Sequence, residues 1–325
     1  MTPVPMAELH VHVEGTATPD LVRRIAARNG LEVPDGLFAS PDRFAWDGFL
    51  SFLDAYDRAA GVIRTGEDYR DIVFEYLARQ AADGVVYVEL TASRDHARLA
   101  GLTDDEHWEG IAAGIDEARA AHGIEARILS SAVRNFGVEQ AVEVAREAAS
   151  RPHPYVVGFS LAGDEAGYPP GLFAEAYAIA AEAGLGCTVH AGEWAGADSV
   201  RAALELPVRR LSHGVRAIED PALVADLAQR GTVLEVCPTS NVALGVFRSY
   251  EEHPLRELVD AGVRVTLGSD DPPYFGATVA DEYAIARERF ALDDEQLLAI
   301  TETAIDASFA EPELKQALRR ALPRS

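Results

Sequence analysis

Short apolar or alternating runs recur along the chain, and most are followed by a longer stretch with helical periodicity. The strand-like runs cover residues 7–13, 85–90, 126–133, 156–162, 186–190, 210–213, 232–237 and 264–269. The clearest helical stretches cover residues 170–183, 198–206, 221–230 and 253–261. Strands that alternate with helices indicate βα units and a parallel sheet, and eight of them predict an α/β fold of the (β/α)8 TIM barrel type. A doubly wound open sheet is the alternative.

Helix boundaries follow known residue preferences. Pro19 and Asp20 predict the start of a helix, and Asn29 and Gly30 predict its end. Two further helices are expected to end directly before strands, at residues 182–184 and 260–262, where a glycine can take the left-handed conformation.

Residues 30–67 form a helical insertion after the first strand. They carry an apolar stripe near helical spacing, made of Phe44, Trp46, Phe49, Phe52 and Leu53. The stripe predicts a helix that packs on the barrel or a cap over the mouth of a site, where Phe49 and Phe52 would contact a substrate. No low-complexity linker interrupts the chain, so residues 1–325 are predicted to form a single domain.

Acidic residues outnumber basic ones, 53 against 29, and the formal net charge is −24. Such a protein repels a phosphate backbone, so no nucleic acid partner is expected. No apolar run reaches the roughly 18 residues of a membrane span, and the N-terminal residues do not resemble a signal peptide. Cys187 and Cys237 form no CxxC pair, which argues against a disulfide framework or a cysteine-rich zinc site. A cytoplasmic location is expected.

Residues that can bind a metal gather at predicted strand ends. They are His10, His12, His190, His213, Asp270 and Asp271. His10 and His12 point to the same face because residues i and i+2 of a strand share a face. The C-terminal ends of barrel strands converge on one side of the barrel, where barrel enzymes place their chemistry.

Each of these signals also has a structural interpretation, since a single His-x-His is usually packed or exposed and Asp-Asp before prolines is usually a turn. Their combination at four of eight strand ends favours one metal site. Three histidines with carboxylates suit Zn²⁺, with Fe²⁺ as the alternative. Bound zinc lowers the pKa of water to about 7. The other histidines lie in polar or helical contexts and receive no role: His96, His107, His122, His153 and His253.

Glu193 lies three residues after His190, beyond the end of the same predicted strand. A carboxyl group there can reach a substrate beside the metal and act as a general acid. The alternative is a structural acid in the first turn of the next helix.

Several motifs in order resemble the adenosine and adenine deaminase family of the amidohydrolase superfamily. They are AELHVHVEGT (7–16), LAGDE (161–165), VHAGE (189–193), SHGV (212–215), EVCPTSN (235–241) and SDDPPYFG (269–276). The resemblance covers almost the whole chain. It implies hydrolytic removal of the 6-amino group from an aminopurine, which yields a 6-oxopurine and ammonia.

The resemblance also implies residue roles. One Zn²⁺ per chain would be held by four residues: His10, His12, His190 and Asp270. Glu193 would protonate N1 of the purine, and His213 would hold the attacking water and take part in proton transfer. Asp270 would also contact that water. Asp271 would accept a hydrogen bond from N7 of the tetrahedral species, and the backbone N–H of Gly163 would contact N3. Protonation of N1 relieves the charge that builds during attack, so Glu193 needs a pKa raised by burial.

Departures from the family pattern concern the sugar side of the substrate. In adenosine-specific members the acid two residues after the second histidine, usually Asp, contacts the ribose 5′ hydroxyl, and here it is Glu14. Thr91 stands where many adenosine deaminases have Arg, and Ser160 replaces a frequent Asp. Adenosine or deoxyadenosine is expected first, as the commonest family substrate. Adenine and aminodeoxyfutalosine are the alternatives.

Three rival functions differ more widely. Other amidohydrolases cleave cyclic amides, esters or phosphotriesters, and many use a lysine at the end of the fourth strand, which residues 160–163 lack. An inactive aminopurine-binding protein would have lost a ligand or Glu193. A purely structural barrel would bind no metal. The expected partner is a small molecule, and the sequence leaves a homo-oligomer open.

Overall fold

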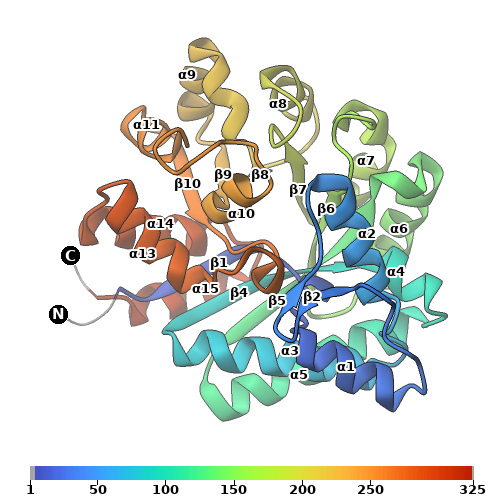
Figure 1. The fold of residues 1–325 in the computed structure, drawn as a ribbon. Coiled ribbons are helices and arrows are strands. Elements are labelled where there is room, and N and C mark those ends of the chain that lie inside the picture. The colour runs from blue at the N-terminus through green and yellow to red at the C-terminus, as the bar shows by residue number, and fades with distance from the viewer. Residues whose placement is uncertain (1–3, 324–325) are drawn as a thin grey trace.

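The computed structural model describes residues 4–323 and contains one eight-stranded sheet. Its strands, in spatial order, are β1 (Met6–His12), β4 (Val85–Ser93), β5 (Glu125–Val133), β6 (Val156–Ala162), β7 (Gly186–Ala191), β8 (Arg210–His213), β9 (Val233–Val236) and β10 (Arg264–Leu267). Neighbouring strands are parallel. The sheet lies inside a ring of helices (Figure 1).

The barrel closes between β1 and the residues that follow β10. Val11 forms a parallel bridge with Asp270. The backbone N–H of His12 donates to the carbonyl of Asp270 at 3.0 Å, and that of Asp270 donates to the carbonyl of His10 at 3.1 Å. The predicted (β/α)8 TIM barrel is therefore confirmed, and the open sheet is excluded.

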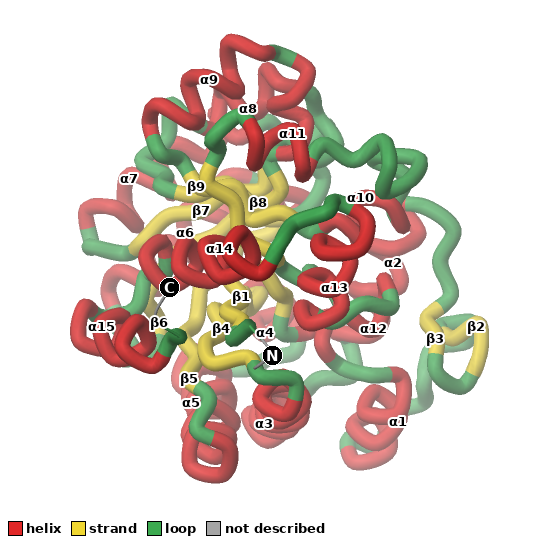
Figure 2. The backbone as a smooth tube through the Cα atoms, turned by 90° about the vertical axis from the view of Figure 1, so that its left-hand side faces the viewer, coloured by secondary structure: helices red, strands yellow, loops and turns green. Residues whose placement is uncertain are grey.

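Helices cover the outside of the barrel, as the tube view shows (Figure 2). The longer ones are α1 (Pro19–Arg28), α3 (Gly66–Ala82), α5 (Asp104–His122), α6 (Val138–Ser150), α7 (Ala174–Glu182), α9 (Pro221–Arg230), α13 (Val279–Arg289), α14 (Asp294–Ala307) and α15 (Pro312–Ala321). Shorter helices are α4 (Arg94–Leu99), α8 (Ala197–Ala203), α10 (Pro238–Ala243), α11 (Leu255–Asp260) and α12 (Pro272–Phe275). Because helices cover the sheet, its strands are almost fully buried and read as apolar runs.

Predicted boundaries agree with the structure within a few residues. Helix α1 begins at Pro19 and is capped by Asn29. Gly184 and Gly262 have φ of 83° and 80°, the left-handed conformation expected after α7 and α11. The last predicted strand, residues 264–269, was two residues too long, since β10 ends at Leu267.

The insertion after β1 contains a hairpin that the sequence pattern did not predict, formed by β2 (Phe38–Ser40) and β3 (Arg43–Phe44). The helix that follows, α2 (Phe49–Ala60), lies at the mouth of the barrel (Figure 1). Phe49, Phe52 and Leu53 line the central pocket there. Helix α2 therefore packs on the barrel and also covers the pocket.

Two further observations agree with the composition. Cys187 and Cys237 are buried and free. Within residues 4–323, the helices are all too short or too polar to cross a bilayer.

Candidate active site

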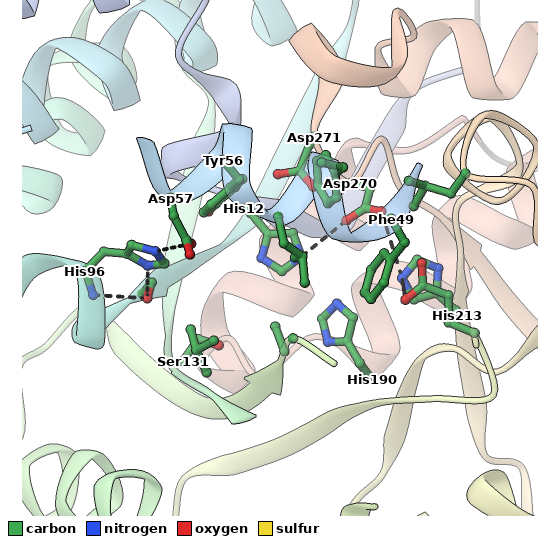
Figure 3. Close-up of a pocket in the computed structure, with 18 residues that line it drawn as sticks. His12, Phe49, Tyr56, Asp57, His96, Ser131, His190, His213, Asp270 and Asp271 are labelled. Carbon is green, nitrogen blue, oxygen red and sulfur yellow. Dashed lines mark hydrogen bonds and ion pairs between the residues drawn. The ribbon is translucent and has the colours of Figure 1, made fainter. Parts of the chain in front are cut away.

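Strand ends bring four histidines together at one end of the barrel. The ring centroids of His10 and His190 lie 4.8 Å apart, and those of His10 and His213 lie 4.6 Å apart. The ring of His12 lies 5.2 Å from that of His190. Figure 3 shows His12, His190 and His213 beside Asp270. Chain segments nearly 260 residues apart therefore form one cluster.

Two residues of this cluster have unusual backbone conformations. His213 and Asp270 both have φ of 63°, a region that residues other than glycine rarely adopt. Such conformations persist where the surrounding structure holds them, and they concentrate at functional sites. His213 ends β8 and Asp270 lies shortly after β10, and both residues line the pocket.

The side chains fall into two groups with metal-binding geometry, in each of which candidate ligand atoms lie within 4.8 Å of one another. The first group is His10, His190, His213 and Asp270, and the second is His12, Asp270 and Asp271. Asp270 belongs to both. The predicted ligand set takes three residues from the first group and His12 from the second. His10 Nε2 and His12 Nε2 lie 3.4 and 3.2 Å from Asp270 Oδ1.

Hydrogen bonds around the histidines fit a divalent cation. His10 Nδ1 contacts the carbonyl of Glu235 at 3.3 Å, and His190 Nδ1 contacts that of Leu161 at 3.0 Å. A ring that donates from Nδ1 to a carbonyl presents the Nε2 lone pair to a metal. Within the described part of the chain, buried His10 Nε2 has no hydrogen-bond partner. Burial and the neighbouring imidazoles lower the pKa of His190, which keeps it in the neutral form that a ligand needs.

Glu193 lies on the loop after β7, is buried and lines the pocket. Its pKa is raised well above the usual range by burial and by the nearby charges of Asp270 and Glu165. The raised pKa favours the protonated carboxyl group, which is the form that a proton donor needs. Its Oε2 lies 3.6 Å from His213 Nε2.

The loop that carries Glu193 is held by Glu165, a residue within the LAGDE motif. Oε2 of Glu165 accepts hydrogen bonds from three consecutive backbone N–H groups, of Glu193 at 3.1 Å, Trp194 at 2.8 Å and Ala195 at 3.1 Å. Its other oxygen accepts from the N–H of Gly192 and the hydroxyl of Ser199. Glu165 thus fixes the backbone at Glu193.

Asp271 is buried beside Asp270 and lines the pocket. Burial and the charge of Asp270 raise its pKa. Among the described residues, Asp271 Oδ1 has no hydrogen-bond partner. An unsatisfied buried oxygen is costly, so the carboxyl group of Asp271 is a candidate to meet a polar group of a substrate in the pocket.

The pocket encloses about 650 Å³ of space that no atom fills, part of which is open to solvent. Nine predicted site residues line it: His12, Phe49, Phe52, Gly163, His190, Glu193, His213, Asp270 and Asp271. His10 lies behind them in the metal cluster.

Glu14 does not line the pocket, although the sequence suggested a contact with substrate. It is buried, and its carboxylate accepts hydrogen bonds from the hydroxyls of Tyr56 and Tyr69, both at 3.1 Å. It also accepts from the N–H of Ser93 at 3.2 Å. Glu14 therefore links the short helical turn after β1 to α2, α3 and β4.

A polar wall opposite the metal cluster was not predicted (Figure 3). His96 Nε2 contacts Asp57 Oδ1 at 2.9 Å, and His96 Nδ1 contacts Ser93 Oγ at 2.7 Å. Tyr56 and Ser131 also line this part of the pocket. No local pattern distinguishes these residues, because they reach the pocket from α2, α4, β4 and β5.

Comparison with known proteins places these features in a family. The adenosine deaminase family model matches residues 5–324. An adenine deaminase from Chelativorans sp. (strain BNC1) is 49% identical over 313 residues, which are 96% of this chain and 96% of that protein. An adenine deaminase from Sinorhizobium medicae (strain WSM419) is 45% identical over 317 residues, 97% of each chain.

Solved structures of related proteins have the same fold as this chain. An adenine deaminase from Arthrobacter aurescens superimposes with a TM-score of 0.89 at 32% identity and covers 97% of each chain. An amidohydrolase from Burkholderia ambifaria, with bound Zn, also gives 0.89, at 26% identity, over 98% of this chain and 89% of that one. The chain therefore belongs to the adenosine deaminase family, and it is a hydrolytic aminopurine deaminase.

Proposed function

We propose that this deaminase acts on free adenine, with Zn²⁺ as its metal. The expectation of adenosine finds no specific support, since the relatives at 44–49% identity are named adenine deaminase. The structural observation that carries the proposal is the position of Glu14. Its carboxylate lies outside the pocket and already accepts from two tyrosines and a backbone N–H, so it is a poor partner for a sugar hydroxyl.

Four residues would hold the zinc: His10, His12, His190 and Asp270. When bound there, zinc would lower the pKa of a water molecule and make it a nucleophile toward C6 of the purine. Two observations support this assignment. His10 Nε2 has no hydrogen-bond partner among residues 4–323 and lies 3.4 Å from Asp270 Oδ1, and the Nδ1 atoms of His10 and His190 contact backbone carbonyls. Ser240 Oγ donates to Asp270 Oδ2 at 2.6 Å and so orients the carboxylate.

Glu193 would donate a proton to N1 as the 6-position is attacked. This transfer prevents a full negative charge on the ring, which stabilises the transition state more than the ground state. The buried carboxyl, with its raised pKa, carries the proton it must give. His213 would contact the attacking water from the same side, since its Nε2 lies 3.6 Å from Glu193.

The remaining polar edges of the base would meet Asp271 and Gly163. The Asp271 carboxyl group, which lines the pocket, would accept a hydrogen bond from N7–H, the proton that free adenine carries in its 7H tautomer. The N–H of Gly163 would donate to N3. Gly163 has φ of 100°, and a Cβ there would lie 2.5 Å from Asn135 Oδ1. Only glycine fits this conformation and this space beside Asn135. Phe49 and Phe52 would cover the base.

A substrate screen tests the proposal. Purified zinc-loaded protein is assayed for ammonia release from adenine, adenosine, deoxyadenosine, methylthioadenosine and aminodeoxyfutalosine. We expect kcat/KM for adenine to exceed the others at least tenfold. A higher kcat/KM for any nucleoside would refute the choice of free adenine. Elemental analysis of protein purified without added metal checks the zinc assignment, and iron in place of zinc would overturn it.

A further inference from the structure

A chain of hydrogen bonds leads from the start of α11 to His213. Leu255 is the first residue of α11, and an N–H at that position has no acceptor within its own helix. It donates to His253 Nδ1 at 3.2 Å. His253 Nδ1 is therefore unprotonated, and burial, which lowers the pKa of His253 to about 3, keeps the ring neutral. The proton of this imidazole is consequently on Nε2.

The next contact fixes the orientation of an amide. His253 Nε2 lies 3.1 Å from Asn241 Oδ1 and donates to it. The reverse orientation of the amide would place its NH₂ against the N–H of His253, two donors with no acceptor between them. Asn241 is fully buried and its NH₂ group therefore faces the third member, His213 Nδ1, at 3.1 Å.

The amide of Asn241 can only donate at this contact, so His213 Nδ1 must accept. A neutral imidazole carries one ring proton, and in His213 that proton is on Nε2. This atom lies 3.6 Å from Glu193 Oε2 and 3.9 Å from Asp270 Oδ2, at the centre of the active site.

We propose that Asn241 and His253 are positioning residues that hold His213 in the Nε2–H tautomer, so that His213 meets the attacking water as a hydrogen-bond donor. This inference rests on the proposed place of His213 beside that water. The backbone N–H of Leu255 can only donate, and it therefore fixes which atom donates at each of the three hydrogen bonds. In this tautomer His213 meets the water through Nε2–H and orients its lone pair toward C6.

The tautomer is measured directly by NMR. Long-range ¹H–¹⁵N correlation of zinc-loaded protein with ¹⁵N-labelled histidine separates protonated from unprotonated ring nitrogens, and His213→Gln identifies the His213 signals by their loss. We expect a protonated Nε2 and an unprotonated Nδ1 in the unaltered protein. A proton on Nδ1 of His213 would overturn the inference without any variant of Asn241 or His253.

Two variants test the positioning role. Asn241→Asp offers only acceptors to His213 and should move the proton to Nδ1, with kcat reduced about tenfold or more through the lost hydrogen bond to the water, and KM changed much less. His253→Gln is the matched control, because its amide can still donate to Asn241 and should preserve the tautomer. An unchanged tautomer in Asn241→Asp would refute the role. The NMR result does not depend on which aminopurine is the substrate, so it separates this inference from the choice of adenine.

Discussion

Gly15 supports the carboxylate of Asp271 from behind: a Cβ atom at Gly15 would lie 1.7 Å from Asp271 Oδ1. Gly15 follows β1 in the short helical turn Glu14–Thr16, and its φ lies outside the left-handed region. Glycine is needed there for space, because the carboxylate that would meet N7 of the base occupies the place of a side chain.

This contact predicts that Gly15→Ala displaces the Asp271 carboxylate and lowers kcat/KM as strongly as Asp271→Asn, by about tenfold or more, since a lost hydrogen bond of this kind costs about 1–3 kcal/mol. Steady-state kinetics and metal analysis of both variants provide the check. Both should keep their metal. Loss of metal in Asp271→Asn alone would instead place Asp271 among the ligands.

Glu193→Gln should retain zinc but lose activity by a factor of about 10²–10⁴, because an amide cannot supply the proton that N1 needs. In the unaltered enzyme the pKa of Glu193 is raised by burial, so kcat/KM should hold through neutral pH and fall only as the pH rises past that raised value. A pH–rate profile measures this limb. An active Glu193→Gln variant would show that another group donates the proton.

Phe49→Ala should raise KM more than it lowers the melting temperature. Phe49 lines the pocket and lies beside Trp194, with ring centroids 4.8 Å apart, but it is only partly buried. The neighbouring Leu50 is 71% exposed and does not line the pocket, so Leu50→Ala is the matched control. Kinetics and thermal melts of the two variants show whether Phe49 covers the bound substrate or only packs against the barrel. A large fall in melting temperature with unchanged KM would favour packing alone.

Glu282→Gln should stabilise the protein at alkaline pH. Glu282 is fully buried on α13, and burial raises its pKa to about 8. Between the ordinary pKa of 4.5 and about 8, the folded state keeps a proton that the unfolded state releases, so stability falls as pH rises through this window.

The amide cannot ionise and can still accept from the N–H of Thr239, which Glu282 Oε1 now meets at 3.0 Å. At pH 8 the gain is expected to reach a few kcal/mol, since each pKa unit is worth about 1.4 kcal/mol. Calorimetric melts at pH 5 and pH 8 test this, with exposed Glu288→Gln on the same helix as control. An equal melting temperature for Glu282→Gln and the unaltered protein at pH 8 contradicts the prediction.

The sequence by itself determined the repeating βα pattern and the strand ends that carry histidines and aspartates. Strand-like and helical runs alternate with local periodicity, and eight of them favour a barrel over an open sheet. Residues at the C-terminal ends of barrel strands converge, so the sequence predicts that His10, His190 and Asp270 lie together. The position of Glu193, three residues after His190, was enough to predict that its carboxyl group could act as a general acid.

Tertiary structure alone decided how the rest of the site is arranged. Glu14 faces two tyrosines from the insertion and α3, so packing between distant segments places it outside the pocket. His96 reaches the pocket because Asp57 lies opposite it on α2. The link from His253 to His213 joins residues 40 positions apart. Such contacts depend on which helix packs beside which strand end, and no local pattern of apolar and polar residues encodes that choice.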